Sequence, residues 1–566
     1  MRGGMIKEYL RHLKLVKEPG LSAELSSMMG DEKRISAAFS GELSFGTGGL
    51  RAIMGAGVSR MNIYTVRRAS LGLAEYTRAI GGAYAAVGYD TRRNSELFAR
   101  VTAEALSERG VSVYLFAMPY PTPMLSYAVR ELRCDVGVMI TASHNPREYN
   151  GYKVYGSDGG QITDEAAKRI AEYISKEDYF ETEKNDAEKG KISYIEDSLY
   201  DSYIETVSAI CAPYEAGGEK DIKIAYTALN GTGARPVLRI LEENGYKNVV
   251  RVEEQMLPDG DFPTCPYPNP ELPEALTLGI KYAKKSEADI LLATDPDSDR
   301  VGVAVRHGEE YRILTGNEVG VLLLDFLVSK RDEEGTMPPS AVAYKTVVTS
   351  RLCDRIAEAY GIELRSVLTG FKYIGEGLEG LRSEGREGDF LLGFEESCGY
   401  LSGPHVRDKD GVNAALLIAH LTAFHKAGGK TLVDALADIY EKYGYETTHL
   451  SSYVFDGEGA KERVGKLMSA LRSGAVRAFG QYELTDYSLG VGRLPKSDVL
   501  VFSFDIAKDT GLENGASLTV TVRPSGTEPK VKLYLSALGE REPYTKWLIA
   551  QALEYFGKLI EHFEKL

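Results

Sequence analysis

The chain has 566 residues, of which 43% are hydrophobic and 26% charged, a composition typical of a globular protein with roughly three or four domains. Its 67 basic and 82 acidic residues give a formal net charge of -15, which argues against nucleic-acid binding and against docking on anionic membranes. An anionic ligand would therefore need a local cluster of basic side chains.

The N-terminal segment, residues 1–17, is expected to form an amphipathic helix that packs on the first domain. Its apolar side chains recur at helical spacing, at Tyr9, Leu10, Leu13 and Val16. It lacks the continuous apolar stretch of a signal peptide, and no apolar run in the chain is long enough to cross a bilayer. The five scattered cysteines form no CxxC pair, which is typical of reduced thiols. These features predict a cytoplasmic protein without membrane partners.

A polar turn follows the apolar run at residues 136–140. That run predicts a buried strand, and the next six residues, TASHNP, predict a loop at the C-terminal end of the strand. Ligands bind at this end of the strands in open α/β sheets. Ser143 and His144 therefore place a hydroxyl and an imidazole where a substrate is expected. A Ser-His pair by itself also fits an ordinary solvated turn.

A second apolar run, residues 289–294, leads into the sequence DPDSDR. Asp295, Asp297 and Asp299 alternate, so in an extended segment their carboxylates point to one side. Three such carboxylates repel one another, and each is costly to remove from water. A Mg²⁺ ion relieves both problems and keeps coordination positions for phosphate oxygen or water. We therefore predict a magnesium site, because an acidic solvated turn explains neither the alternation nor the closing Arg300.

A third run of the same kind, residues 389–394, leads into EESCGY. The repetition of an aspartate, an apolar run and a polar segment indicates three related α/β units, each presenting one functional loop. Glu395 and Ser397 are able to exchange hydrogen bonds with neighbouring hydroxyls of a sugar. This segment alone fits equally well a helix N-terminus with acidic residues in its first turn.

A fourth polar segment, RPSGTEPK at residues 523–530, lies between two β-rich runs near the C-terminus. Arg523, Ser525 and Thr527 combine with Gly526, whose backbone leaves N–H groups accessible, and this favours an anion-binding turn. A plain hairpin loop would need the turn residues but not the arginine and both hydroxyls together. Phosphate is the expected anion.

The four segments resemble, in the same order, those of the α-D-phosphohexomutases, the family of phosphoglucomutase and phosphomannomutase. TASHNP resembles the phosphoserine loop of that family, DPDSDR its magnesium loop, FEESCGY its sugar-binding loop and RPSGTEPK its phosphate-binding loop. FGTGGLR at residues 45–51 and VGYDTR at residues 87–92 resemble further family segments. The resemblance spans most of the chain. DPDSD stands where many relatives have DGDxD, a change that removes no carboxylate.

The resemblance implies a phosphosugar mutase that works through a phosphoserine. Phospho-Ser143 would pass its phosphoryl group to a hexose monophosphate, and the bound bisphosphate would turn end for end and return its other phosphoryl group. With glucose phosphates, glucose 1-phosphate becomes glucose 6-phosphate through glucose 1,6-bisphosphate, and Mg²⁺ is the implied cofactor. The implied metal ligands are Asp295, Asp297, Asp299 and Ser143.

The resemblance also implies groups that hold the substrate and move a proton. The implied substrate-binding residues are Glu395, Ser397, Lys372, Arg300, Arg523, Ser525, Gly526 and Thr527. Lys153 matches a family lysine near the phosphoserine and is the expected general base, if burial or neighbouring cations lower its pKa. Arg51 and His144 are the expected cations and complete the catalytic set. The alternative for Lys153 is a surface lysine on a hairpin. The alternative for His144 is a structural histidine that bonds the loop backbone.

Several functional alternatives stay open at this point. By resemblance, glucose phosphate ranks first as substrate, mannose phosphate second and pentose phosphate third. The choice stays open, because one loop does not separate epimers that differ by a single hydroxyl. A phosphohydrolase using the same phosphoserine would admit water, whereas a mutase excludes it by closing its last domain over the substrate. A non-catalytic sugar-phosphate sensor would need neither the serine nor the aspartates. Small-molecule sugar phosphates are the expected partners, and the chain is expected to be a monomer or homodimer.

The expected fold is α/β, with three related α/β mixed-sheet domains around a central cleft and a C-terminal α+β domain. These four domains would carry, in chain order, the phosphoserine, magnesium, sugar and phosphate loops. Their predicted boundaries are 1–213, 214–313, 314–449 and 450–566. Further expected elements are helices at 66–79, 319–328 and 460–471 and a strand at 341–344.

Overall fold

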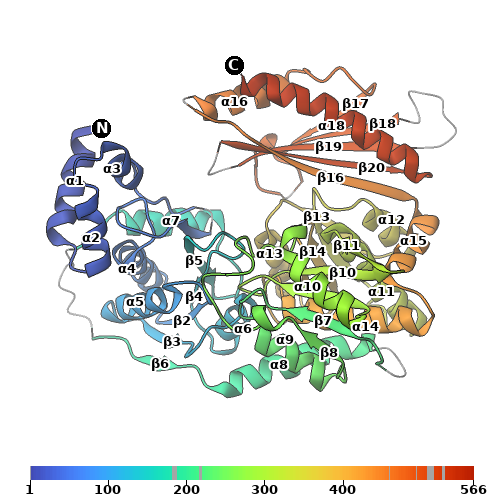
Figure 1. The fold of residues 1–566 in the computed structure, drawn as a ribbon, viewed down its shortest axis with the longest axis horizontal. Coiled ribbons are helices and arrows are strands. Elements are labelled where there is room, and N and C mark those ends of the chain that lie inside the picture. Colours follow the sequence, from blue (N-terminus) through green and yellow to red (C-terminus); the bar gives the residue numbers. More distant parts are fainter. Residues whose placement is uncertain are drawn as a thin grey trace. The chain divides into compact units, whose positions relative to one another are not determined.

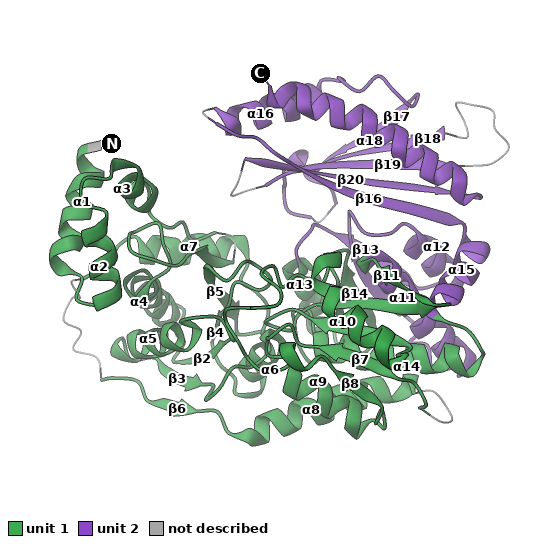
Figure 2. Cartoon of the chain, viewed as in Figure 1, with its two compact units in different colours: residues 1–316, 371–431 green, residues 317–370, 432–566 purple. Residues whose placement is uncertain are grey.

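The computed structural model describes the whole chain except residues 1, 47, 181–187, 216–219, 458, 493, 507–515, 526–528 and 566. It divides into two compact units, which Figure 2 colours separately. Unit 1 comprises residues 1–316 and 371–431, and unit 2 comprises residues 317–370 and 432–566. The predicted four-domain boundaries remain predictions, because these units are not contiguous in sequence.

The first sheet of unit 1 has six strands in the order β1-β5-β4-β2-β3-β6 (Figure 1). β2, β3, β4 and β6 are parallel, whereas β5 is antiparallel to both β4 and β1, so the sheet is mixed, as predicted. The strands are β1 (Gly49–Ile53), β2 (Tyr84–Tyr89), β3 (Ser112–Leu115), β4 (Val136–Ile140), β5 (Tyr149–Gly156) and β6 (Ile192–Tyr194). Its helices are α4 (Ile63–Ala79), α5 (Ser95–Glu108), α6 (Thr122–Glu131) and α7 (Asp164–Ile174).

Helix α4 begins three residues before the predicted start at 66. The Asn62 side chain accepts hydrogen bonds from the N–H groups of Tyr64 and Thr65, and the Thr65 hydroxyl accepts one from the Asn62 N–H. This reciprocal cap stabilises the first turn before the apolar periodicity starts. The buried face of α4 then joins one core with β4 and β5, in which Val66, Val138 and Tyr152 are fully buried.

Three short helices precede the first sheet, and the expected N-terminal helix is present. They are α1 (Arg2–Leu15), α2 (Pro19–Ser27) and α3 (Glu32–Phe39). Tyr9, Val16 and Leu25 pack into a small apolar cluster of their own. The prediction was wrong for Leu10, which is 54% exposed, because its place next to Tyr9 lies about 100° around the helix.

The second sheet of unit 1 has five strands in the order β11-β10-β9-β7-β8. β7 is parallel to β8 and β9, and β10 is antiparallel to β9 and β11, so this sheet is also mixed. Its strands are β7 (Ile224–Thr227), β8 (Val249–Arg251), β9 (Ile290–Thr294), β10 (Val301–His307) and β11 (Glu310–Leu314). The neighbouring helices are α8 (Asp197–Cys211), α9 (Ala234–Glu243), α10 (Pro273–Ser286) and α14 (Gly411–Ala427).

A hairpin of unit 1 carries the predicted sugar loop. β14 (Phe390–Glu395) runs antiparallel to β15 (Gly399–Leu401) and follows helix α13 (Phe371–Ser383). Glu395 therefore ends a strand and enters a tight turn. The alternative that this segment begins a helix is wrong.

Unit 2 contains two different arrangements of strands. The parallel pair β12 (Val342–Thr346) and β13 (Glu363–Val367) accompanies helices α11 (Gly316–Glu333), α12 (Leu352–Tyr360) and α15 (Leu432–Tyr443). The C-terminal part is an antiparallel sheet in the order β16-β20-β19-β18-β17 with two helices, which confirms the predicted α+β region. Its elements are β16 (Tyr445–Val454), α16 (Ala460–Arg472), β17 (Tyr482–Asp486), β18 (Leu500–Asp505), β19 (Ser517–Pro524), β20 (Lys530–Gly539) and α18 (Glu542–Glu564). Among the helices that the structure describes, none is long and apolar enough to cross a bilayer.

Candidate active site

Ser143 lies in the loop after β4, in a left-handed backbone conformation with φ of 52°. Its N–H donates to Thr141 Oγ1 at 2.7 Å, so a neighbouring side chain closes the turn. Its hydroxyl donates to Asp295 Oδ2 at 2.8 Å and lies 3.1 Å from His144 Nδ1. The residue is only 3% exposed. A buried hydroxyl between a carboxylate and an imidazole suits a nucleophile or a covalent carrier.

The three predicted metal ligands converge through a turn after β9. Asp295 Oδ1 accepts the N–H groups of Asp299 and Arg300, each at 3.1 Å, and Ser298 is left-handed with φ of 51°. The expectation of an extended segment is therefore wrong, although the carboxylates do meet. One carboxylate oxygen from each of Asp295, Asp297 and Asp299 lies within 4.8 Å of the others.

The electrostatics of these buried aspartates fit a divalent cation. Burial, and then the charges of Asp297 and Asp299, raise the pKa of Asp295 well above its ordinary value. Asp297 Oδ1 and Asp299 Oδ1 are buried and accept no hydrogen bond from any residue that the structure describes. Crowded carboxylates with such oxygens are the donor set that Mg²⁺ prefers. Each aspartate is thus able to supply one ligand.

Lys153, on β5, forms ion pairs with two of the aspartates. Its Nζ lies 2.7 Å from Asp297 Oδ2 and 3.5 Å from Asp299 Oδ2. Burial acts to lower the pKa of Lys153, but the two carboxylates outweigh it and raise that pKa. The same pair lowers the pKa of Asp297 against the effect of burial. The lowered pKa expected for Lys153 is therefore not found, because its neighbours are anions, and its role as a base stays a prediction.

His144 and Arg51, the two residues expected as cations beside Lys153, lie next to the Ser143 loop. Burial, with the charges of Arg300 and Arg51, lowers the pKa of His144 well below its ordinary value, so this imidazole is neutral near pH 7. Arg51 is exposed on β1 and donates to Asn145 Oδ1 at 3.1 Å. Both residues thus border the Ser143 loop. Their catalytic roles stay predictions.

Two further residues contact the aspartates but were not predicted. The Thr122 hydroxyl donates to Asp297 Oδ2 at 2.9 Å, and the Thr122 N–H donates to the carbonyl of the same aspartate at 2.8 Å. Lys409 Nζ lies 3.1 Å from Asp299 Oδ2 and 2.9 Å from Asp408 Oδ1. The alternating charges of the RDKD segment around Lys409 were a usable signal. Nothing local marked Thr122 apart from its place between two prolines at the start of a helix.

Arg92 was missed as well. Its side chain is fully buried beneath the Ser143 loop and donates to the Ser143 carbonyl oxygen. The available signal was the pair of opposite charges at Asp90 and Arg92 after the apolar residues 85–89, since Asp and Arg are rarely buried unless they are paired.

The predicted sugar loop lies next to the aspartate turn. The Val301 N–H, just after that turn, donates to the Cys398 carbonyl at 3.0 Å. Glu395 is buried and Ser397 is half-buried, while Cys398 is left-handed with φ of 63°. The Lys409 side chain packs on the end of the turn. The structure therefore brings the sugar loop and the aspartate loop together, and the sugar contacts of Glu395 and Ser397 stay predictions.

Lys372 and Arg300 are both paired within unit 1. Lys372, in the first turn of α13, lies 2.5 Å from Asp164 Oδ1. Arg300 is partly buried and pairs with Glu271; burial acts to lower its pKa, but Glu271 and the nearby aspartates outweigh it and raise that pKa. A substrate phosphate would compete with these carboxylates for either cation. The substrate-binding roles of both residues stay predictions.

The predicted phosphate loop belongs to unit 2. Arg523 on β19 lies opposite Lys532 on β20, and the Ser525 N–H donates to the Lys530 carbonyl at 2.7 Å. Two like charges opposite each other on antiparallel strands are destabilising unless an anion offsets them. Gly526 and Thr527 lie outside the described residues. The local geometry is therefore compatible with phosphate binding.

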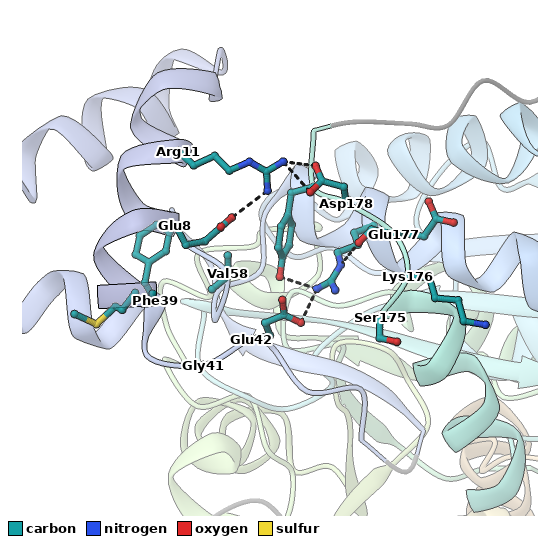
Figure 3. A pocket seen from close by; sticks show the side chains of 14 residues that line it. Glu8, Arg11, Phe39, Gly41, Glu42, Val58, Ser175, Lys176, Glu177 and Asp178 are labelled. Atoms are coloured by element: carbon teal, nitrogen blue, oxygen red, sulfur yellow. Dashed lines mark hydrogen bonds and ion pairs between the residues drawn. The ribbon is translucent and has the colours of Figure 1, made fainter. Parts of the chain in front are cut away.

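A separate cavity of about 500 Å³ lies between α1 and the end of α7, and its ion pairs are drawn in Figure 3. Arg11 binds Asp178 at 2.6 Å, and Arg68 binds Glu42 at 2.8 Å. The Arg68 guanidinium also stacks on the Tyr179 ring, 4.5 Å from its centroid. None of the candidate site residues lines this cavity. Its ion pairs connect the N-terminal segment to α4 and to the residues after α7.

Three family models match the chain. Residues 42–181 match phosphoglucomutase/phosphomannomutase α/β/α domain I, residues 201–308 match domain II and residues 315–443 match domain III. Together they cover more than half of the chain and contain the Ser143, aspartate and sugar loops.

Curated relatives and solved structures agree with these matches. The chain is 37% identical over 526 residues to the phosphoglucomutase of Staphylococcus saprophyticus, covering 89% of this chain and 92% of that one. It is 35% identical over 519 residues to the phosphoglucomutase of Staphylococcus haemolyticus, covering 88% and 91%. A crystal structure of a phosphomannomutase homologue from Thermus thermophilus is similar in fold, with a TM-score of 0.67 and 24% identity over 92% of this chain and 99% of that one.

Proposed function

Because the chain belongs to the phosphoglucomutase/phosphomannomutase family and is a phosphohexomutase, we propose that it interconverts glucose 1-phosphate and glucose 6-phosphate through a phosphoserine at Ser143. Glucose is proposed as the sugar because the curated relatives at 37% and 35% identity, aligned over nearly their whole length, are phosphoglucomutases. Glucose 1,6-bisphosphate is the proposed intermediate and activator.

The observation that carries this proposal is the contact between Ser143 Oγ and Asp295 Oδ2 at 2.8 Å. It places the proposed carrier hydroxyl beside a cluster of buried carboxylates. Asp295, Asp297 and Asp299 would hold Mg²⁺, which when bound supplies charge neutralisation at an oxygen of the transferring phosphoryl group. A phosphoryl oxygen of phospho-Ser143 would add a fourth oxygen to this donor set.

Each transfer makes one phosphorus–oxygen bond and breaks another. The substrate hydroxyl oxygen bonds to phosphorus as the bond from phosphorus to Ser143 Oγ breaks. The proton of that hydroxyl goes to a base, and Ser143 Oγ takes up a proton as it leaves, so that the serine hydroxyl is restored. Lys153 is the proposed base. Because Asp297 raises the pKa of Lys153, this role requires the charge of Asp297 to be offset during transfer. The return step runs the same chemistry in reverse after the bisphosphate has turned.

The remaining groups are proposed to hold the ring and the phosphate that does not react. Glu395 and Ser397 would bind ring hydroxyls, and Arg523 with Ser525 would bind the distal phosphate. Such orientation contributes several kcal/mol, up to roughly 10, in intramolecular analogies. The chain is further proposed to act in the cytoplasm as a monomer or homodimer.

A coupled assay tests the proposed reaction. Enzyme is supplied with glucose 1-phosphate, Mg²⁺ and a trace of glucose 1,6-bisphosphate, and both glucose 6-phosphate and free phosphate are followed. Formation of glucose 6-phosphate without free phosphate is the expected result. Stoichiometric free phosphate would indicate a phosphohydrolase instead. Turnover of mannose or pentose phosphates only would overturn the proposed sugar, and binding without turnover would indicate a sensor.

A further inference from the structure

Arg92 binds the backbone of the Ser143 loop through both terminal nitrogens of its guanidinium. Nη2 donates to the carbonyl oxygens of Ser143 and Asn145. Nη1 donates to the carbonyl oxygens of Pro146 at 2.9 Å and Tyr149 at 3.2 Å. Four carbonyl groups spread over seven residues therefore converge on one side chain. The backbone of this loop also bonds to itself, from the Asn145 N–H to the Ala142 carbonyl at 3.1 Å and from the Tyr149 N–H to the Pro146 carbonyl at 3.0 Å.

The guanidinium is held in place from the side opposite the loop. Asp90, at the end of β2, lies 3.3 Å from Arg92 Nε and accepts the Arg92 N–H at 2.9 Å. Ser95 donates to the same carboxylate at 2.7 Å, and Asn150 donates to the Ser95 hydroxyl at 3.0 Å. These side chains are all buried. The Arg92 side chain is thus held by an ion pair with Asp90, a carboxylate directly after β2 that buried hydrogen bonds fix in place.

An aromatic ring from the loop between β8 and α10 covers a face of the guanidinium. Arg92 Cζ lies 5.1 Å from the ring centroid of Phe262, which is fully buried and left-handed with φ of 45°. Gly260, in the same loop, approaches so closely that an added Cβ would lie 2.4 Å from the Arg93 nitrogen. The Phe262 loop therefore packs directly on the Arg92 turn, and the guanidinium is sealed from water on all sides.

We propose that Arg92 is a positioning residue for phosphoryl transfer, which holds the Ser143 hydroxyl at Asp295 by binding four carbonyl oxygens of its loop. This inference rests on the proposed function, in which Ser143 carries the phosphoryl group. Asp90 and the buried residues bonded to it hold the Arg92 side chain. Arg92 in turn holds the Ser143 loop, and the loop directs Ser143 Oγ to Asp295. Arg92 itself touches no reacting atom.

The geometry requires an arginine and not merely a positive charge. A guanidinium offers paired N–H groups in a rigid planar fork, whereas a lysine ammonium offers three donors on a flexible stem. A lysine at position 92 would keep the ion pair with Asp90 and lose most of the carbonyl bonds. Because misplacement by about 1 Å costs on the order of 100-fold in rate, kcat is expected to fall by about that factor. The KM for glucose 1-phosphate is expected to change little, because the groups proposed to grip the substrate are untouched.

The test compares Arg92→Lys with the wild type in steady-state turnover and in the single-turnover transfer of phosphoryl from glucose 1,6-bisphosphate to Ser143. Arg109→Lys is the matched control. Arg109 is another buried arginine of unit 1, and its ion pairs with Glu75 at 3.0 Å and Glu177 at 2.9 Å lie away from the Ser143 loop. Thermal unfolding of all three proteins is measured so that activity is compared well below each transition.

A roughly 100-fold loss of transfer rate and kcat in Arg92→Lys, with KM preserved and Arg109→Lys unaffected, supports the proposal. Wild-type kcat in a folded Arg92→Lys protein overturns it, whatever the change in melting temperature. If Arg92→Lys does not fold, Phe262→Leu removes the ring and keeps the arginine, and an unchanged kcat in that variant overturns the proposal. A wild-type protein that never takes phosphoryl on Ser143 would instead overturn the proposed function itself.

Discussion

Ser143 Oγ and Asp295 Oδ2 lie 2.8 Å apart although 152 positions separate the two residues in sequence. A phosphoryl group on this hydroxyl would bring further negative charge to a site with three buried carboxylates. At such short range in a buried environment the repulsion is strong unless a cation offsets it. Phosphorylation of Ser143 and binding of Mg²⁺ are therefore expected to favour each other.

Replacing Ser143 by alanine is expected to abolish mutase activity, because it deletes the proposed covalent carrier. Labelled bisphosphate should leave no phosphoryl group on the variant. Ser70→Ala is a suitable control, since the Ser70 hydroxyl is buried on α4 and lies 3.1 Å from the Tyr152 hydroxyl. Residual turnover of Ser143→Ala at the wild-type rate would show that another residue carries the phosphoryl group.

Replacing Asp299 by asparagine is expected to weaken Mg²⁺ binding. A cation that binds only the folded state raises the melting temperature, so Mg²⁺ should stabilise the wild type, and the rise should shrink in the variant. This readout does not depend on activity. Asp201→Asn removes an exposed carboxylate paired with Arg239 at 2.6 Å and should keep the full Mg²⁺ effect. If Mg²⁺ raises the melting temperature of Asp299→Asn as much as that of the wild type, the cation binds at another site.

Replacing Lys153 by arginine separates charge from proton transfer. Arginine keeps a positive charge beside Asp297 but stays protonated, so it does not serve as a base. If Lys153 is the base, kcat should fall by roughly 100-fold or more. Lys345→Arg makes the same exchange at another buried lysine, which pairs with Asp354 at 2.5 Å. If Lys153→Arg keeps the wild-type kcat, Lys153 is not the base and contributes only a positive charge beside Asp297.

Replacing Arg523 by alanine is expected to raise the KM for glucose 1-phosphate, because the distal phosphate loses a charged hydrogen-bond donor. Such bonds contribute about 1.5–3 kcal/mol, which corresponds to roughly 10- to 100-fold in affinity. Arg472→Ala, which removes an arginine of unit 2 paired with Asp486 at 2.8 Å, should leave KM unchanged. An unaltered KM in Arg523→Ala would remove this residue from the substrate site.

His420 is expected to make the protein less stable in acid. Burial lowers the pKa of His420 to about 4, and its Nδ1 lies 2.7 Å from the Tyr246 hydroxyl. An unfolded histidine titrates near 6.5, so the unfolded chain binds the proton more readily, and stability falls as pH drops from about 6.5 towards 4.

Between pH 7 and pH 5 this residue should cost the wild type about 2 kcal/mol of unfolding free energy. His420→Gln should lose that dependence, whereas replacing the exposed His307 by glutamine should not. Denaturant unfolding at the two pH values measures the difference. An identical pH dependence in wild type and His420→Gln would contradict the assignment.

The amino-acid sequence alone was enough to predict several strands and loops and to indicate the family. The runs at 136–140 and 289–294 are strands, and the polar segments after them are loops, because periodicity and turn chemistry are properties of neighbouring residues. The order of the four loops was likewise enough to indicate the family. The exact ends of elements were less predictable, since α4 starts early through a cap at Asn62 that lies outside the apolar pattern.

The surroundings of each candidate side chain, in contrast, depend on how distant segments fold together. The pKa of Lys153 is raised rather than lowered because Asp297, which is 144 positions away, folds against it. Thr122 and Arg92 entered the site because their partners come from other segments of the chain. Coulomb interactions and hydrogen bonds depend on distance in space, and a linear sequence records distance only along the chain.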